Sequence, residues 1–245
     1  MTPEEWAETS SVGGFFALRT GHATHSYVAL GSLYAGRTAP LTARIDTVAA
    51  RLGAPERRVA ASVAQLGLAA RLWSIALGPA VLHGVLPDLA PDRLYWDGGR
   101  SSPDDLLLDP GARSRQATVE GLVELVLDGH LAPLADAVRR DTAVSHGLLR
   151  GNAGSALAGA VRELHAWARK TNRPEVAERA LALGAELLAH PQLADAGTLL
   201  AGGAFRRGSC CLYYRCPGGG LCGDCVFERP PQPSSRRTAP ERRHP

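Results

Sequence analysis

The sequence predicts a mainly α-helical fold with a small β element, followed by a cysteine-rich segment near the C-terminus. Three observations lead to this prediction: apolar residues recur at helical spacing in several stretches, apolar triplets flank one loop-like stretch, and five cysteines fall between residues 210 and 225. The 245 residues, 45% of them hydrophobic, suffice to bury a substantial core. We expect a helical body over 1–203, the cysteine segment over 204–227 and a disordered basic tail, rich in Pro and Arg, over 228–245.

The expected helices follow from apolar residues spaced three or four positions apart. They begin at Pro3 and continue over 41–52, 55–77, 119–127, 131–144, 147–170 and 174–190. Thr2 is the expected cap of the first helix, and Gly53 sits where the second should stop. The Gly78-Pro79 pair predicts the end of the third helix near Leu77.

Two segments do not show this spacing. Residues 12–37 mix Gly, Thr and His with short apolar pieces, and we predict an irregular structure there. Leu94-Tyr95-Trp96 and Leu106-Leu107-Leu108 flank a stretch rich in Gly, Ser, Pro and Asp, which predicts two short strands around a loop.

The helix expected over 147–170 places Gly151, Ser155 and Gly159 on one face. Small side chains at this spacing let a neighbouring backbone approach closely. The simplest interpretation is close helix packing, and a second hypothesis is that this face seats the cysteine segment.

Charge and hydropathy exclude some classes of function. Five Arg and two Glu in the last eighteen residues account for the formal net charge of +3, so the body is neutral and offers no broad basic face for nucleic acid. The acidic N-terminus lacks a signal-peptide pattern, so we expect a cytoplasmic protein whose thiols stay reduced. The most apolar stretch, 64–82, contains Arg71, which favours a buried helix over a membrane span. The basic tail allows at most weak peripheral contact with an anionic membrane.

Four cysteines form the pattern Cys210-Cys211-x10-Cys222-x2-Cys225, with Cys216 between the two pairs. Adjacent cysteines are awkward partners for a mutual disulfide, and zinc sites normally space their pairs by two to four residues. A set of four thiolates with irregular spacing favours an iron–sulfur cluster. A structural zinc site and a redox disulfide remain the alternatives, and Cys216 is interpreted as a spare thiol.

The cysteine segment resembles the FhuF family of ferric-siderophore reductases. The resemblance rests on the cysteine spacing together with Tyr213-Tyr214-Arg215 and the run from Pro217 to Cys225. In the body, Leu86-Pro87-Asp88-Leu89 and the run from Gly151 to Gly159 are similar to family landmarks more loosely.

The resemblance implies a 2Fe-2S cluster held by Cys210, Cys211, Cys222 and Cys225. It implies one-electron reduction of the ferric iron in a siderophore, which then releases ferrous iron in the cytoplasm. No flavin or nicotinamide site is visible, so electrons should come from a ferredoxin or a flavin reductase. The nearby Arg206, Arg207 and Arg215 are candidates for binding an anionic ferric chelate and for stabilising the reduced cluster.

Two alternatives for the whole protein remain open. One is a non-catalytic metal-binding protein, with zinc or iron–sulfur, whose cysteine segment is structural. The other is a relative from siderophore biosynthesis, which would need a phosphate-cradling loop that is not visible. Gly218-x-Gly220-x-x-Gly223 formally fits a dinucleotide fingerprint, but no strand-to-helix unit surrounds it. The closely spaced pair His22 and His25 is interpreted as incidental.

Overall fold

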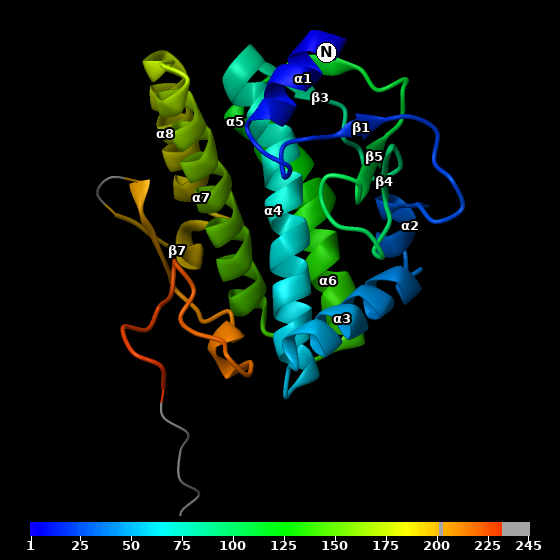
Figure 1. Ribbon diagram of the computed structural model, residues 1–245, viewed down its shortest axis with the longest axis vertical. Helices are drawn as coiled ribbons and strands as arrows, with labels where there is room; N and C mark the ends of the chain where they lie inside the picture. Colours follow the sequence, from blue (N-terminus) through cyan, green and yellow to red (C-terminus); the bar gives the residue numbers. More distant parts are fainter. Residues whose placement is uncertain (201–202, 232–245) are drawn as a thin grey trace, which may run out of the picture.

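The computed structural model describes residues 1–200 and 203–231. Two long helices, α4 (Arg57–His83) and α7 (His146–Lys170), lie side by side at the centre of the fold (Figure 1). Helix α8 (Pro174–Ala189) packs on α7, and α3 (Ala39–Leu52) packs on α4. The prediction of a mainly helical protein with small β elements is confirmed. The predicted tail lies outside the described residues from position 232 onward.

Helix α4 is the core helix of the body. It is long and apolar enough to cross a membrane by length and composition, but 78% of its most apolar window is buried inside the protein. Arg71 in its middle is buried and pairs with Asp105, with Nε 2.9 Å from the carboxylate oxygen. The same guanidinium donates to the carbonyls of Phe15 and Ala17, so the N-terminal loop is fastened to α4. The expected buried helix is confirmed.

The predicted end of α4 near Leu77 is wrong, because the helix continues through Pro79 to His83. Proline removes one backbone donor without forcing the chain to stop. The neighbouring Gly78 serves packing instead: a Cβ there would come within 2.9 Å of Phe16 and of Thr9. The helix ends at Gly84, whose φ of 70° is left-handed.

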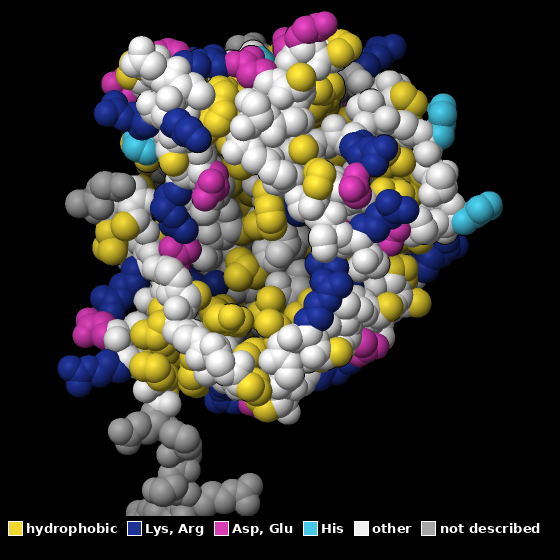
Figure 2. Space-filling model, in the orientation of Figure 1, with side chains coloured by type: hydrophobic (Ala, Val, Ile, Leu, Met, Phe, Trp, Pro, Cys, Tyr) yellow, Lys and Arg dark blue, Asp and Glu magenta, His cyan; other side chains and the backbone are white. Residues whose placement is uncertain are grey.

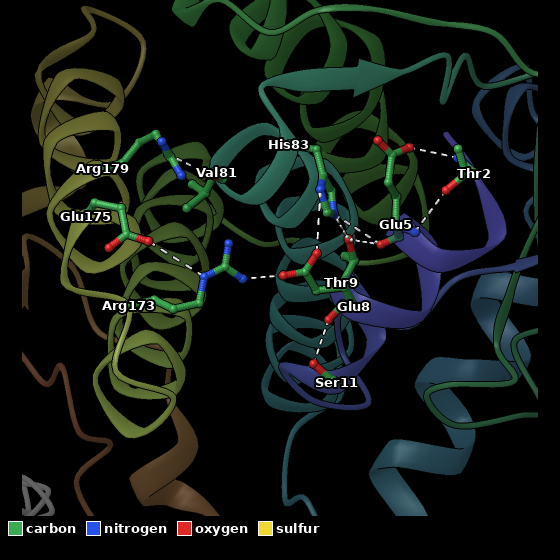
Figure 3. Close-up of polar contacts among 10 residues, drawn as sticks. All are labelled: Thr2, Glu5, Glu8, Thr9, Ser11, Val81, His83, Arg173, Glu175 and Arg179. Atoms are coloured by element: carbon green, nitrogen blue, oxygen red, sulfur yellow. Dashed lines mark hydrogen bonds and ion pairs between the residues drawn. The ribbon is translucent and has the colours of Figure 1, made fainter.

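The contacts in Figure 3 hold α1 (Pro3–Ser11) against the C-terminal end of α4. The ring of His83 lies 3.2 Å from the hydroxyl of Thr9. Arg173, just before α8, pairs with Glu8 in α1. Helix α1 and the start of α8 therefore meet at the C-terminal end of α4, away from α3 (Figure 1).

A four-stranded sheet covers the other side of α4, in the order β1 (Arg19–Thr20), β5 (Leu106–Leu108), β4 (Leu94–Trp96) and β2 (Val28–Ala29). The central strands β4 and β5 are those predicted from the apolar triplets, and they pair antiparallel. The segment over 12–37 is irregular along most of its length, as expected, but it also contains β1, β2 and the short helix α2 (Leu30–Tyr34). Two-residue strands are too short to show an alternating pattern, and they are fixed by pairing with β5 and β4.

The predicted helices at 119–127 and 131–144 form one continuous helical stretch. It consists of α5 (Val119–Leu122), a π-helical part η1 (Val123–Leu131) and α6 (Ala132–Asp141). The backbone N–H of Ala132 bonds to the carbonyl of Leu127, five residues back. A second small sheet, β3 (Val85–Pro87) with β6 (Ser114–Gln116), connects this region to the end of α4.

The chain reaches the cysteine segment through a hairpin on α7. A 3₁₀ turn, η2 (Ala194–Ala196), leads into β7 (Gly197–Leu199), which pairs with β8 (Phe205–Arg207). Gly154 of α7 makes this approach possible, since a Cβ there would lie 2.7 Å from Ala196 and 3.1 Å from Phe205. The hairpin thus delivers the cysteines to the N-terminal half of α7.

Candidate metal centre

The backbone bends sharply after the adjacent cysteines. Leu212 adopts a left-handed conformation with φ 69°, and the 3₁₀ turn η4 (Tyr213–Arg215) follows. Left-handed backbone is uncommon for a leucine and is held here by its surroundings. Gly219 then folds back onto this turn, where a Cβ would lie 2.4 Å from the carbonyl oxygen of Tyr213. The segment is therefore a compact loop, and Gly219 serves its folding.

The four predicted ligand cysteines share one local feature, in which the backbone N–H two residues later favours the thiolate. Leu212 donates to the sulfur of Cys210 at 3.3 Å and Phe227 to that of Cys225 at 3.4 Å, and the N–H groups of Tyr213 and Asp224 act to lower the pKa of the Cys211 and Cys222 thiols. Among the described residues, Cys216 has no such donor. Backbone donors to sulfur stabilise the thiolate and tune the potential of a bound cluster. The pattern separates the four predicted ligands from the fifth cysteine.

Two of these sulfurs form a close pair. The Sγ atoms of Cys211 and Cys222 lie 3.5 Å apart. The hydrogen bond from Cys222 lowers the pKa of the Cys211 thiol to about 6, and Arg207 acts in the same direction. The same contact raises the pKa of Cys222, so the two sulfurs share one proton between them. The pair thus favours a thiolate, the form that binds metal.

The other two predicted ligands lie beside this pair. Burial raises the pKa of Cys210, and the nearby thiols of Cys211 and Cys225 raise it further. Cys211 is buried, whereas Cys210, Cys222 and Cys225 are partly exposed. The site is thus seated on the body on one side and open toward the surface on the other.

Arg207 supplies positive charge from beneath the cysteines. It is 2% exposed, and its charge acts on the thiols of Cys210, Cys211 and Cys222. Its Nε donates to the carbonyl of Ser209 at 2.9 Å, but its Nη1 is buried without a hydrogen-bond partner. A buried cation with a free N–H accommodates an anionic group beside it. A 2Fe-2S cluster with four thiolates has a net negative charge, so this arrangement fits the cluster.

A buried hydrogen-bond network joins the cysteine segment to α4 and α7. Ser62 of α4 donates to the carbonyl of Cys211 at 2.8 Å. Asn152 of α7 donates to Gln65 at 2.8 Å and to the carbonyl of Ser62 at 2.9 Å. The amide oxygen of Asn152 accepts from Arg207. The network therefore fixes the position of a ligand cysteine relative to the helical core.

The small-residue face of α7 also contacts the cysteine segment, as the second hypothesis drawn from the sequence predicts. A Cβ on Gly151 would lie 2.3 Å from the Ser209 hydroxyl, and Ser155 donates to the carboxylate of Asp224 at 2.5 Å. Asp224 also pairs with Arg162 of α7 at 3.1 Å. Gly159, in contrast, faces open space, because a Cβ there would have only Arg162 as a neighbour, at 3.9 Å.

The three arginines near the motif lie in different surroundings. Arg206 is exposed and pairs with Glu228 at 3.3 Å, and Arg215 pairs with Glu56 while lying over the ring of Tyr214. Both remain predicted contacts for a ligand from solution. Arg207 is turned inward, so its guanidinium can act on the cluster but cannot reach a docked chelate.

The sulfur arrangement distinguishes between one metal ion and two. Within residues 1–200 and 203–231, no three His, Cys, Asp or Glu side chains converge as a single ion requires, and this includes His22 and His25. Two sulfurs bound tetrahedrally to one ion at about 2.3 Å lie about 3.8 Å apart, close to the observed separation of Cys211 and Cys222. A closed zinc site needs four ligands around one ion, whereas a 2Fe-2S cluster takes two cysteines on each iron. The one close pair of sulfurs, Cys211 and Cys222, therefore fits the cluster better than a closed zinc site.

Comparison with known families decides the matter for this segment. Residues 207–227 match the sequence model of a family described as the FhuF 2Fe-2S C-terminal domain. The cysteine segment is thus similar to the FhuF 2Fe-2S C-terminal domain. The matched residues include all four predicted ligands. The looser similarities in the helical body, at residues 86–89 and 151–159, lie outside the matched range. No protein of curated function matches the chain.

Sequence reasoning gave no role to several residues that build this FhuF-type site. Asn152 and Ser62 bridge the two core helices, and Asp224 fastens the loop between Cys222 and Cys225 to α7. A polar residue inside a run of small apolar ones was the available signal for Asn152. No local pattern marks Ser62, because its partner lies 149 positions away in the chain.

Proposed function

We propose that this protein is a ferric-siderophore reductase that delivers one electron at a time to chelated ferric iron. The observation that carries the proposal is the FhuF 2Fe-2S match over residues 207–227, on a loop where three of the four predicted ligand cysteines are partly exposed. A bound 2Fe-2S cluster supplies a one-electron carrier at this surface. We place the reaction in the cytoplasm, where thiols are kept reduced.

The chemistry of the substrate explains why one electron is enough. Siderophores hold ferric iron through hard oxygen donors. A ferric ion that gains one electron becomes ferrous, which is softer and less charged and is held far more weakly by such donors. The chelator itself is not broken, and the electron lost by the protein must be replaced by an external donor. We propose a ferredoxin or a flavin reductase as this donor.

The residues of the chain have defined tasks in this reaction. Cys210, Cys211, Cys222 and Cys225 hold the cluster, with their backbone donors stabilising the thiolates. Arg207 lies beneath these cysteines and offsets the negative charge of a bound cluster, which favours its reduced state. The network through Asn152 keeps this charge in place without exposing it to water.

The test is electron transfer from the isolated protein. Anaerobically reduced, cluster-loaded protein is mixed with hydroxamate and catecholate ferric complexes in the presence of a ferrous-specific chromogenic chelator. We expect one ferrous ion for each protein that is reoxidised, with the same yield from Cys216→Ser. No transfer to either class of complex would contradict the proposal.

The second candidate is a non-catalytic role, in which the cysteine segment holds the C-terminal part to the body. The contacts from Ser62 to the carbonyl of Cys211 and from Ser155 to Asp224 favour it, because they are structural ties. A protein of this kind would keep its metal through repeated exposure to reductant and ferric chelate without any redox cycling. The transfer experiment separates the two candidates.

A further inference from the structure

A groove between α4 and α7 runs from the N-terminal loop to the cysteine segment. It has a volume of about 450 Å³, within the range of small-molecule sites. Its floor is apolar and includes Leu66 and Ala70 of α4 and Ala156 and Ala160 of α7. On the face drawn in Figure 2, a hollow lined by hydrophobic side chains lies between the positions of these two helices in Figure 1.

The groove is formed before any ligand binds. Its upper wall is the loop at residues 12–16, which is held by the buried Arg71 through the carbonyls of Gly14 and Phe15. The Phe15 side chain on this loop is 45% exposed, which is unusual for a large aromatic residue. On the α7 side, Gly159 leaves space where another residue would place a side chain. A wall held by hydrogen bonds and the free space beside a glycine are features of a preformed binding site, and not of a loosely packed contact between two helices.

The other end of the groove is Asp224, which belongs to the cluster-binding loop. It is two residues from Cys222 and one from Cys225. Because each residue spans at most about 3.6 Å of chain, the backbone of Asp224 lies within roughly 7 Å of the backbone of both cysteines. A ligand in the groove would therefore lie next to the point where the electron leaves the protein.

The charges of the groove select among chelates. Its ionic side chains are Arg162, Glu163 and Asp224, and Arg162 already pairs with Asp224 at 3.1 Å. The lining therefore has a slight excess of negative charge, which repels a polyanion and accepts a neutral or cationic ligand. The attraction of an anionic chelate by Arg206, Arg207 and Arg215, expected from the sequence, does not apply here, since none of the three lines the groove.

From these observations we infer that the α4–α7 groove is the docking site for the chelate, and that it takes an oxygen-donor ferric complex of zero or positive net charge. This inference rests on the proposed function and locates its substrate. The apolar floor contacts the organic backbone of the chelator. The polar end at Ser155, Arg162 and Asp224 faces the metal-binding groups.

The inference is tested by binding to the oxidised, cluster-loaded protein, with gallium(III) complexes as redox-inactive probes. A neutral tris-hydroxamate complex should bind to the wild type, and a trianionic tris-catecholate complex at least tenfold more weakly. Gly159→Trp and Ala70→Phe fill the groove from its two sides, and each should weaken binding of the neutral complex at least tenfold. The visible spectrum of the cluster should stay unchanged in both variants.

Two controls separate filling of the groove from general damage. Gly67→Ala adds a methyl group to α4 in open space outside the groove and should bind as the wild type does. Ala182→Phe fills a cavity of about 500 Å³ between α7 and α8 and should also leave binding unchanged.

The outcomes distinguish the docking site from the reaction. If the wild type reduces ferric complexes and both groove-filling variants do so with unchanged KM, the groove is not the docking site although the proposed function stands. If the gallium complex binds in the groove but the wild type reduces no ferric complex, the proposed function fails and the site survives. Tighter binding of the trianionic complex would overturn the assignment of charge.

Discussion

The sulfur atoms of Cys211 and Cys222 lie 3.5 Å apart, although eleven positions separate the residues in the chain. The left-handed turn at Leu212 and the tight approach at Gly219 bring them together. Because the pair is within the distance that one tetrahedral metal allows, we expect Cys211 and Cys222 to bind one iron and Cys210 and Cys225 the other.

The first prediction concerns the protein without its cluster. Mild oxidation of the apoprotein should yield a Cys211–Cys222 disulfide as the main product, because these sulfurs are already adjacent and their contact lowers the pKa of the Cys211 thiol. Trypsin and a protease that cleaves before Asp224 leave Cys216 and Cys222 on one peptide, so the linked cysteine is assigned by fragmenting that peptide in tandem mass spectrometry. A main product that contains Cys216 would contradict the observed arrangement.

The second prediction compares two neighbouring glycines in the loop. Gly219→Ala places a Cβ 2.4 Å from a backbone oxygen, which cannot move aside without opening the turn, whereas Gly220→Ala meets nothing within 4 Å. Gly219→Ala should destabilise the loop by about 1–3 kcal/mol and lower the iron retained after purification. Gly220→Ala should retain as much iron as the wild type. Equal retention in both variants would show that the turn is not fixed as described.

The third prediction concerns the buried charge of Arg207. Arg207→Gln should lower the midpoint potential by roughly 60 mV or more, the one-electron equivalent of a tenfold change, because a nearby positive charge favours the reduced state. Arg207→Lys should recover part of the shift, since it keeps the charge but not the fork that reaches Asn152. Arg206→Gln is the matched control on the surface. Redox titration followed by EPR measures all three, and equal shifts in the Arg206 and Arg207 variants would contradict the assigned role.

The fourth prediction concerns stability at low pH. Burial lowers the pKa of His130 to about 4; its Nε2 donates to the carbonyl of Leu89 at 2.7 Å, and its Nδ1 accepts from Tyr34. The unfolded chain takes up this proton near pH 6.5, so the stabilising contribution is complete above pH 6.5 and is lost as the pH falls toward 4. The loss is on the order of 3 kcal/mol.

Urea unfolding at pH 7.5 and pH 5 measures this loss. His130→Gln should lose less stability between the two pH values than the wild type does. The exposed His22→Gln serves as the control and should follow the wild type. A His130→Gln variant with the pH dependence of the wild type would contradict the prediction.

The sequence carried more information about the metal centre than about the contacts that hold the cysteine segment on α4 and α7. The spacing of the cysteines predicted the FhuF-type domain, because ligand spacing is a local property of the chain. The helices were predicted from their apolar stripes. The end of α4 was predicted wrongly from the Gly78-Pro79 pair, because Gly78 is needed for close packing against Thr9 and Phe16, which lie far away in the sequence. The network of Ser62, Asn152 and Arg207 and the groove ending at Asp224 depend on contacts between remote segments. Single-sequence patterns do not reveal such contacts.

The most direct test of the central claim is EPR of anaerobically purified protein after dithionite reduction, together with its iron and sulfide content. Two irons and two sulfides per chain and a signal from one unpaired electron are expected, unchanged in Cys216→Ser and lost in Cys222→Ser. Colourless wild-type protein with stoichiometric zinc and no signal would contradict the account.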